Sequence, residues 1–508
     1  MSVHNLAKVY SAELEGVDAR LIEVEVDLNV GLHAFTIVGL ADKALNEARE
    51  RVNSALKNSG VKPPNRENRR ITINLAPADV KKSGSQYDLA LALGYLAATE
   101  QVGTFDSKNK VFVGELALDG RVRPISGALS IAEMAGRLEI SELYLPEENA
   151  REASVVKNVK IIPVSDLKSL ILHLENKINI PPTVFKEEFI ERIIGVDFSE
   201  IKGQENAKRA LTIAAAGGHN VLLVGSPGVG KSLLAQALSG ILPSLNTGEA
   251  IEVTKIQSAS GLLPKGLITE RPFRSPHHTA SLVSIVGGGP EPKPGEISLA
   301  HRGVLFLDEV PEFQRSALEA LRQPLENGSV TIARAKGTLS FPARFTLVAA
   351  MNPCPCGFFG DSEKECRCSA YEVIRYQKKI SGPLLDRIDL QVKVSRVQIE
   401  ELQEIGERPQ ETPVIRKSVE RVRQVQKERF RKIPIHANSE MSSKHVDSFV
   451  ILTPEAKDFM TSLKKHHLSP RGYYRLLKTA QTIADLEEKS EVHLPHVAEA
   501  FSYRIREE

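Results

Sequence analysis

Apolar runs and amphipathic stretches alternate through the first 170 residues. Runs typical of strands occur at Leu21–Val26, Phe35–Val38, Arg70–Asn74, Lys110–Val113 and Lys160–Val164. Apolar residues recur at helical spacing over Lys43–Ser59 and Tyr87–Ala98. The alternation predicts an α/β domain over residues 1–171.

The pattern changes twice further along the chain. Residues 172–190 contain a Pro-Pro pair and predict a linker. A second region of strands and helices follows over 191–396. From 397 to 508 the pattern is mainly helical, with Val419, Val422 and Val425 at helical spacing among Arg and Lys. The predicted fold class is α/β, with an N-terminal α/β domain, an α/β core and a helical C-terminal domain.

Composition narrows the class of protein. A chain of 508 residues accommodates roughly two to four domains. Its 42% hydrophobic and 26% charged residues are typical of a globular protein. No apolar run reaches the ~18–20 residues of a membrane span, and the first residues do not resemble a signal peptide. We therefore expect a cytoplasmic protein with no membrane partner. The net charge of +2 means that a nucleic-acid partner must be argued from local patches.

A glycine-rich loop follows the apolar run Val221–Val224 and precedes a helical pattern. It consists of Gly225, Ser226, Pro227, Gly228, Val229, Gly230, Lys231 and Ser232. This is the P-loop pattern, in which backbone N–H groups face phosphates, the lysine meets the terminal phosphates and the serine hydroxyl binds Mg²⁺. The loop predicts binding of ATP with Mg²⁺.

Two later apolar runs end in polar residues that suit ATP hydrolysis. Val304–Leu307 is followed by Asp308 and Glu309, where one carboxylate can hold Mg²⁺ and the other can activate water. Alternatively, two such acids would be solvated or would cap a helix. The upstream P-loop favours the catalytic interpretation. The run Phe345–Ala350 leads to Asn352, an amide placed to sense the γ-phosphate.

The order of these motifs resembles AAA+ ATPases of the magnesium-chelatase clade. Leu-Leu-Asp-Arg at 384–387 and Ser-Pro-Arg at 469–471 complete the order. Taken alone, each arginine would be an ordinary surface residue. The resemblance implies that Arg387 is an arginine finger acting on a neighbouring subunit, that Arg471 is sensor 2, and that the protein forms a ring, commonly a hexamer.

Within that clade, residues 271–279 and 351–357 resemble the YifB/ComM family, and the similarity covers essentially the whole chain. The resemblance implies a DNA motor, a helicase or branch-migration protein of homologous recombination or natural transformation. The alternative is a chelatase-like or protein-remodelling ATPase that acts on a protein partner.

The N-terminal domain is similar to the Lon protease domain over residues 114–127. The position of the general-base lysine in that pattern is occupied by Leu129, and the nucleophile position by Gln86. An offset of one residue would admit Ser85. A serine hydroxyl without a base is not activated at neutral pH. We therefore expect a scaffold domain and not a peptidase.

All four cysteines fall within a 354–368 insertion, as Cys354, Cys356, Cys366 and Cys368. Four thiolates can hold Zn²⁺ tetrahedrally, and this closed set predicts a structural zinc site beside Asn352. The alternative is four reduced thiols clustered by chance. The adjacent pair His277 and His278 points apart on regular structure, so we expect a structural or DNA-facing role there.

Residues 328–341 alternate as expected for a β-hairpin, with Arg334 and Lys336 near its turn. In related rings a hairpin before the sensor asparagine contacts DNA, so these two residues are the predicted DNA contacts. The alternative is a solvated turn. Basic residues along 421–432 are interleaved with glutamates, which favours a solvated helix face.

Overall fold

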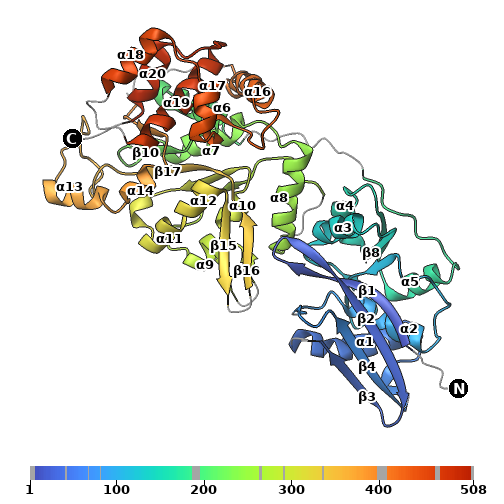
Figure 1. Cartoon of the computed structure of the whole chain (residues 1–508). Helices are drawn as coiled ribbons and strands as arrows, with labels where there is room; N and C mark the ends of the chain where they lie inside the picture. The colour runs from blue at the N-terminus through green and yellow to red at the C-terminus, as the bar shows by residue number, and fades with distance from the viewer. Residues whose placement is uncertain are drawn as a thin grey trace. The chain divides into compact units, whose positions relative to one another are not determined.

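The computed structural model describes residues 6–39, 43–66, 68–80, 82–185, 195–262, 266–289, 292–334, 337–397, 409–463 and 469–504. The chain forms two compact units, shown in Figure 1. The first contains Met1–Ile190 together with Ala250–Ile268, and the second contains Glu191–Glu249 together with Thr269–Glu508.

A seven-stranded mixed sheet forms the centre of the first unit, in the order β3-β4-β2-β1-β5-β8-β9. Strands β1 and β2 are a long antiparallel pair, and β5, β8 and β9 run parallel. The strands are β1 (Leu6–Glu15), β2 (Asp18–Val30), β3 (Ala34–Val38), β4 (Arg69–Ala76), β5 (Lys110–Phe112), β8 (Glu142–Pro146) and β9 (Lys160–Val164), with a small ribbon of β6 (Glu115–Leu116) and β7 (Val122–Arg123).

Helices of this unit bury apolar faces against the sheet. They are α1 (Lys43–Asn58), α2 (Asp88–Ala98), α3 (Ala128–Arg137), α4 (Glu147–Ala153) and α5 (Leu167–Leu174). Helix α2 is apolar on nearly all sides and almost wholly buried, as expected for a helix in the middle of a core.

Helix α8 (Thr247–Ala259) comes from the middle of the sequence, yet most of it belongs to the first unit. Lys255 Nζ lies 2.7 Å from Glu133 and 3.1 Å from Asp18. Ser258 Oγ donates to the buried Glu152 and accepts from the N–H of Gly127 at 2.9 Å. A helix remote in sequence is thus fixed to α3 and α4 by polar contacts.

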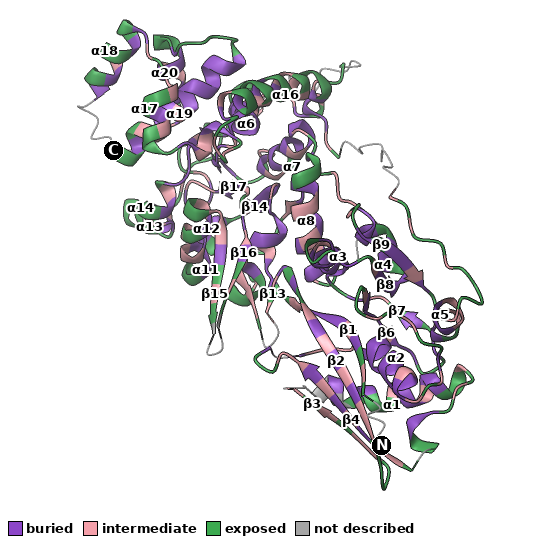
Figure 2. Cartoon of the chain, turned by 45° about the vertical axis from the view of Figure 1, so that its right-hand side comes forward, coloured by how far each residue is buried: buried purple, intermediate pink, exposed green. Residues whose placement is uncertain are grey.

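The second unit has a five-stranded parallel sheet in the order β11-β14-β17-β10-β18. The strands are β11 (Phe273–Arg274), β14 (Val304–Leu307), β17 (Thr346–Met351), β10 (Val221–Val224) and β18 (Leu390–Lys393). The continuous apolar sequences of β10 and β14 fit a parallel sheet covered on both faces. Figure 2 shows β14 and β17 as buried, and every residue of both strands except Thr346 is apolar. The carboxyl ends of these strands therefore define one edge, where ligands of such sheets bind.

Helices and ribbons around this sheet are α6 (Glu205–Gly217), α7 (Lys231–Ile241), α9 (Leu282–Val286), α10 (Glu296–Leu299), α11 (Arg315–Ala320), α12 (Arg322–Asn327), α13 (Ala370–Gln377), α14 (Gly382–Leu385), the ribbon β12 (Gly287–Gly288) with β13 (Lys293–Pro294), and the hairpin β15 (Ser329–Arg334) with β16 (Gly337–Pro342). Short 3-10 turns lie at Pro64–Arg66, Phe198–Glu200, Val310–Glu312 and Asn438–Glu440.

The C-terminal helices are α16 (Thr412–Arg429), α17 (Ser443–Phe449), α18 (Pro454–Ser462), α19 (Pro470–Leu486) and α20 (Leu494–Ser502). They gather in one bundle at the red end of the chain (Figure 1). Val419, Leu476 and Ala480 from these helices share one apolar core with Leu211 of α6 and Leu234 of α7. The bundle is therefore packed onto the helices that flank the P-loop strand.

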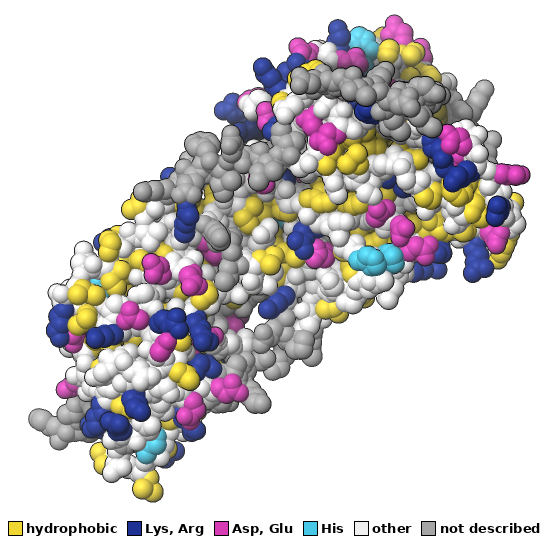
Figure 3. Space-filling view, turned by 180° about the vertical axis from the view of Figure 1, so that it is seen from behind, with side chains coloured by type: hydrophobic (Ala, Val, Ile, Leu, Met, Phe, Trp, Pro, Cys, Tyr) yellow, Lys and Arg dark blue, Asp and Glu magenta, His cyan; other side chains and the backbone are white. Residues whose placement is uncertain are grey.

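Most of the expected strands and helices form close to their predicted limits, and the α/β fold class is confirmed. In the part of the chain that the structure describes, no helix is both long and apolar enough to cross a membrane. On the face shown in Figure 3, Lys and Arg side chains are interspersed with Asp and Glu.

Candidate nucleotide-binding site

The glycine-rich loop connects β10 to the N-terminus of α7. Gly228 and Gly230 have φ angles of 80° and 89°, in the region that glycine adopts without a steric penalty. Helix α7 begins at Lys231. The loop thus directs backbone N–H groups and the positive end of a helix toward one place, an arrangement that binds phosphate.

Lys231 lies in the middle of this site and is largely buried. Its ammonium donates to the carbonyls of Gly225 at 2.7 Å and Ser226 at 3.0 Å, and to Asn352 Oδ1 at 3.1 Å. Burial lowers its pKa, and the charge of Asp308 opposes that shift. The P-loop lysine and the sensor asparagine therefore meet, although 121 residues separate them.

Ser232 and Asp308 meet at the end of β14. Ser232 Oγ donates to Asp308 Oδ2 at 2.8 Å, which places two oxygen ligands suited to Mg²⁺ side by side. Glu309 follows with a φ of 51°, unusual for a residue other than glycine, and its N–H donates to Asp308 Oδ1 at 2.9 Å. Its side chain is 55% exposed, and His278 Nδ1 lies 3.5 Å from its carboxylate.

A pocket of about 360 Å³ collects these groups. It is lined by Pro227, Gly228, Gly230, Lys231, Ser232, Leu233, Asp308, Glu309, Met351 and Asn352. The volume lies within the ~300–1,000 Å³ usual for ligand sites. The pocket thus combines the glycine-rich loop, a cation, two oxygens suited to Mg²⁺ and an exposed carboxylate, which are the kinds of group that ATP hydrolysis uses.

Arg387 and Arg471 do not line this pocket. Each arginine donates a hydrogen bond through its Nη2 to the carboxylate of Glu326, near the end of α12. The distance from Arg471 is 2.8 Å. Arg387 is buried and also donates to the carbonyl of Pro383 at 2.6 Å, whereas Arg471 is half exposed. The Arg387 hydrogen bond lowers the pKa of Glu326. The predicted arginine finger and the predicted sensor 2 arginine therefore both contact Glu326, and neither lines the pocket of its own chain.

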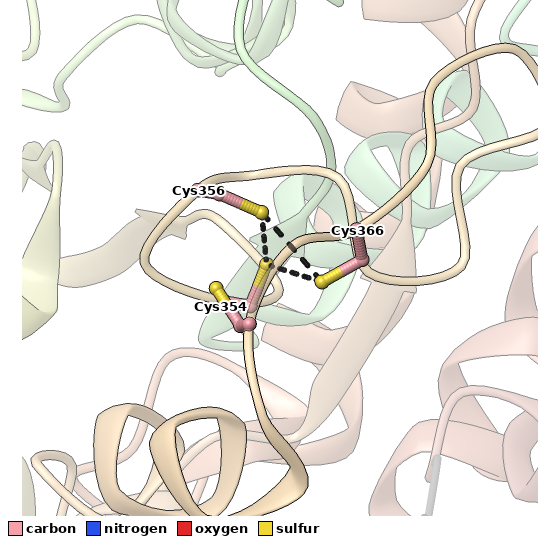
Figure 4. A group of neighbouring side chains, drawn as sticks. Cys354, Cys356 and Cys366 are labelled. Atoms are coloured by element: carbon pink, nitrogen blue, oxygen red, sulfur yellow. Dashed lines mark hydrogen bonds between the residues drawn. The ribbon is translucent and has the colours of Figure 1, made fainter.

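The four cysteines cluster in the loop after β17, as Figure 4 shows for three of them. Sulfur-to-sulfur distances are 3.4 Å for Cys354 to Cys356, 3.7 Å for Cys354 to Cys366 and 3.6 Å for Cys356 to Cys366. All four sulfurs, including that of Cys368, lie within 4.8 Å of one another. Thiolates at ~2.3 Å from a tetrahedral zinc would be about 3.8 Å apart, so the cluster fits the ion.

Two residues beside these groups, Asp361 and Glu326, have no motif that would reveal them. Asp361, in the cysteine loop, accepts a hydrogen bond from the P-loop hydroxyl of Ser226, and this bond holds its pKa far below the usual range. Glu326 pairs with both arginines. Only the side-by-side position of these segments in space reveals the contacts.

The expectation that His277 and His278 point apart is wrong, because the two residues lie outside helix and strand. Their ring centroids are 4.2 Å apart, and His278 lies beside Glu309.

The hairpin β15–β16 is paired from Ser329 with Pro342 to Arg334 with Gly337. Val330 and Phe341 anchor its base in the core, while Thr331, Ala333 and Thr338 are exposed. Lys336, one predicted DNA contact, lies outside the described residues, as does the side chain of the other, Arg334.

Ser85, the serine admitted by the one-residue offset, and the nearby Ser83 both contact carboxylates in the N-terminal unit. Ser83 Oγ donates to Glu13 at 3.1 Å, and Ser85 Oγ donates to Glu115. Lys82 is buried, with its ammonium on the carbonyl of Pro77. Leu129 is buried in α3.

Together, the parallel sheet, the P-loop, the two carboxylates after β14 and the asparagine after β17 define a P-loop ATPase of the AAA+ class. Three family profiles match separate parts of the chain. They are "Magnesium chelatase, subunit ChlI" over residues 197–402, "Subunit ChlI of Mg-chelatase" over 24–149, and "Magnesium chelatase, subunit ChlI C-terminal" over 409–504.

Full-length relatives narrow the family. The chain is 44% identical to the competence protein ComM of Haemophilus influenzae, over 98% of this chain and 97% of the relative. It is 40% identical to the uncharacterized protein YifB of Escherichia coli, over 98% and 97%. A Lon protease of Rhizobium meliloti is 30% identical over 31% of this chain and 20% of its own length. The chain belongs to the YifB/ComM family of magnesium-chelatase-like AAA+ proteins, a membership that implies ATPase activity with ATP and Mg²⁺.

Proposed function

We propose that this protein is an ATP-driven, ring-forming DNA motor, a helicase or branch-migration protein of homologous recombination or natural transformation. The hairpin β15–β16 carries the DNA part of the proposal, since it precedes the sensor strand β17 and has Arg334 and Lys336 at its turn. Backbone phosphates are the natural partners of such basic tips. Similarity to a competence protein supports the same target.

In the proposed hydrolysis, each group of the pocket has one task. Lys231 binds the β- and γ-phosphates, and Ser232 and Asp308 hold Mg²⁺. Glu309 has an exposed carboxylate and acts as the base that orients and deprotonates the attacking water. Asn352, already hydrogen bonded to Lys231, contacts the γ-phosphate.

Arg387 completes the site of a neighbouring subunit in the proposed ring, which we take to be a homohexamer, and Arg471 acts as sensor 2. The position of Arg387 at Glu326, outside the pocket of its own chain, supports action on another chain. A guanidinium that stabilises charge on the transferring phosphate accounts for a large part of the rate in such ATPases.

Cys354, Cys356, Cys366 and Cys368 hold a structural Zn²⁺ in this proposal. The sulfur spacing supports it. Such an ion closes and stiffens the loop, and with four protein ligands it leaves no open position for catalysis.

The N-terminal unit is proposed to be a scaffold and not a peptidase. Ser83 and Ser85 both donate to carboxylates, and Lys82 donates to a backbone carbonyl. Neither hydroxyl is paired with a basic nitrogen among the hydrogen bonds found in the described ranges of this unit, as activation of a serine would require.

A second candidate is a chelatase-like or protein-remodelling ATPase that acts on a protein partner. The matches to magnesium-chelatase subunit profiles favour it. Steady-state ATP hydrolysis with and without single-stranded or branched DNA separates the two. The DNA proposal predicts stimulation by DNA that disappears in Glu309→Gln. Absence of DNA binding at low salt would overturn it and favour the protein partner.

A further inference from the structure

The cysteine loop and the P-loop contact each other at three points. Asp361 accepts the hydroxyl hydrogen bond of Ser226. Gly357, with a φ of 86°, packs on Pro227 so closely that an added Cβ would lie 2.6 Å from its Cδ. Asn352, the first residue of the loop, accepts a hydrogen bond from Lys231. The first two contacts involve P-loop residues that precede helix α7, and the third involves Lys231, the first residue of that helix.

Asp361 is buried and fixed in position by several hydrogen bonds. Its side chain is 1% exposed, and Arg396, which follows β18, donates to it at 2.9 Å. Its second oxygen accepts the N–H groups of Glu363 at 2.9 Å and Lys364 at 3.1 Å. The carboxylate is therefore neutralised by a guanidinium and fixed by its own loop, with one remaining bond directed at the P-loop.

The cysteine loop is held by side-chain contacts, such as those of Arg396, and by the four clustered sulfurs, and not by regular secondary structure. Residues 352–369 contain no helix or strand. Loops longer than ~12–15 residues without secondary structure are uncommon in compact domains and are usually functional. A metal bound to four thiolates would close this loop at two points twelve residues apart, from Cys354 to Cys366, and so fix the position of Asp361 between them.

We propose that the cysteine loop is a metal-dependent clamp on the P-loop, with Asp361 as the positioning residue that joins the zinc site to the ATP site. The inference rests on the proposed zinc occupancy. With metal bound, Asp361 and Gly357 hold Ser226 and Pro227 in the phosphate-binding conformation, so nucleotide binds a preorganised loop. Coupling between two sites is reciprocal, so nucleotide must tighten the binding of zinc by the same factor by which zinc tightens the binding of nucleotide.

The test uses the full-length protein and two binding measurements. Metal analysis gives the zinc content, equilibrium competition with a chromogenic chelator gives the zinc affinity with and without ADP, and a fluorescent nucleotide gives Kd. In the wild type we expect about one zinc per chain and a zinc affinity raised by roughly 5- to 150-fold with ADP, the usual range of coupling. In Asp361→Asn we expect unchanged zinc content, loss of the ADP effect, and a Kd raised by a similar factor.

Matched variants separate the clamp from a folding defect. Glu363→Gln removes an exposed acid of the same loop that also contacts Arg396, and it should behave as the wild type. Ser226→Ala removes the bond to the P-loop and leaves the ion pair of Asp361 with Arg396 in place, so it should abolish the ADP effect as Asp361→Asn does. The double variant should then be no worse than Asp361→Asn alone.

The outcomes are distinct. Zinc near zero in the wild type, with normal nucleotide binding, would refute the proposed zinc site and the clamp with it. Full zinc content with the same zinc affinity in the presence and absence of ADP, and normal Kd in Asp361→Asn, would overturn the clamp and leave the ATPase and the zinc site standing.

Discussion

Glu309 shows how a single residue is prepared for catalysis. It follows the buried strand β14, has a left-handed backbone conformation and exposes its carboxylate beside the pocket. Such a conformation costs roughly 1–3 kcal/mol in a residue other than glycine and is often found at functional sites. The turn directs Asp308 toward Ser232 and leaves Glu309 free to meet water.

Replacing Glu309 by Gln should leave nucleotide affinity nearly unchanged and lower kcat for ATP hydrolysis by about 10²–10⁴-fold, the usual contribution of a positioned base. Fluorescent-nucleotide binding and phosphate release measure the two quantities. Glu312→Gln is the control, since that acid lies on the same turn but pairs with Lys379 at 3.2 Å. Equal loss in both variants would show that the turn, and not the Glu309 carboxylate, is required.

The sequence predicted the residues that the pocket brings together, because each follows a buried strand or lies in a P-loop of fixed spacing. Lys231, Ser232, Asp308 and Asn352 are examples. Asp361 and Glu326 could not be predicted in the same way. Their partners Ser226 and Arg387 are 135 and 61 residues away, and no local pattern marks the contact.

At the scale of elements, the hairpin β15–β16 combines a buried base with exposed outer residues. Its anchoring by Val330 and Phe341 means that changes at the turn leave the core intact. This separation makes the hairpin a suitable place to test nucleic-acid contact without disturbing the ATP pocket.

The double variant Arg334→Glu with Lys336→Glu should weaken DNA binding by at least tenfold at low salt, because two cations next to phosphates become two anions. Basal ATP hydrolysis without DNA should stay the same. Fluorescence anisotropy with labelled single-stranded DNA measures the affinity. The control is Lys444→Glu, which reverses the charge of one exposed lysine in α17 and so matches the charge change of a single substitution in the hairpin. Unchanged DNA affinity in the double variant would show that the hairpin does not contact DNA.

The C-terminal bundle is joined by a buried ion pair between α16 and α19. Arg429 Nη1 lies 2.8 Å from Asp485, whose side chain is 1% exposed, and Asn438 donates to the same carboxylate at 2.8 Å. Removing one member of a buried pair leaves an uncompensated charge.

Asp485→Ala should therefore destabilise the bundle by about 3–5 kcal/mol. Glu488→Ala breaks the exposed pair with Arg421 and should cost at most about 1 kcal/mol. Hydrogen exchange of the amides in α16 and α19 measures the loss of stability in the bundle. Equal protection of these amides in Asp485→Ala and Glu488→Ala would contradict a stabilising role of the buried ion pair.

Elements were predictable where the buried positions are apolar, as in β4, β10 and β14. Strand β1 was not predicted, because Ser11 and Glu13 occupy buried positions and interrupt its apolar alternation. Glu13 accepts hydrogen bonds from Ser83 and Gln86, which makes its burial possible. A buried polar residue is recognised only when its partner is known.

At the scale of the whole molecule, the chain has two units whose cores are separate, and residues 250–268 of the middle belong to the first. A pattern along the sequence cannot reveal this grouping, since Lys255 and Ser258 find their partners more than 100 residues away. The ATP pocket, the cysteine loop and the two arginines all belong to the second unit.

A ring with shared sites predicts complementation between inactive subunits. Lys231→Ala lacks nucleotide binding but retains Arg387, and Arg387→Ala has the reverse defect. Mixing the two should restore part of the ATP hydrolysis, because some interfaces then combine an intact pocket with an intact arginine. Each variant alone, at the same total concentration, is the control. If the mixture hydrolyses ATP no faster than the two variants do separately, Arg387 does not act on a neighbouring subunit.

The most direct measurement of the central proposal is ATP-driven movement of a DNA branch, followed with a fluorescently labelled four-way junction. The wild type with ATP and Mg²⁺ should convert the junction into duplex products. Glu309→Gln should bind the junction without converting it, and Glu312→Gln should convert it normally. A wild-type protein that hydrolyses ATP but neither binds nor moves the junction, at low salt, would contradict the proposal that this ATPase is a DNA motor.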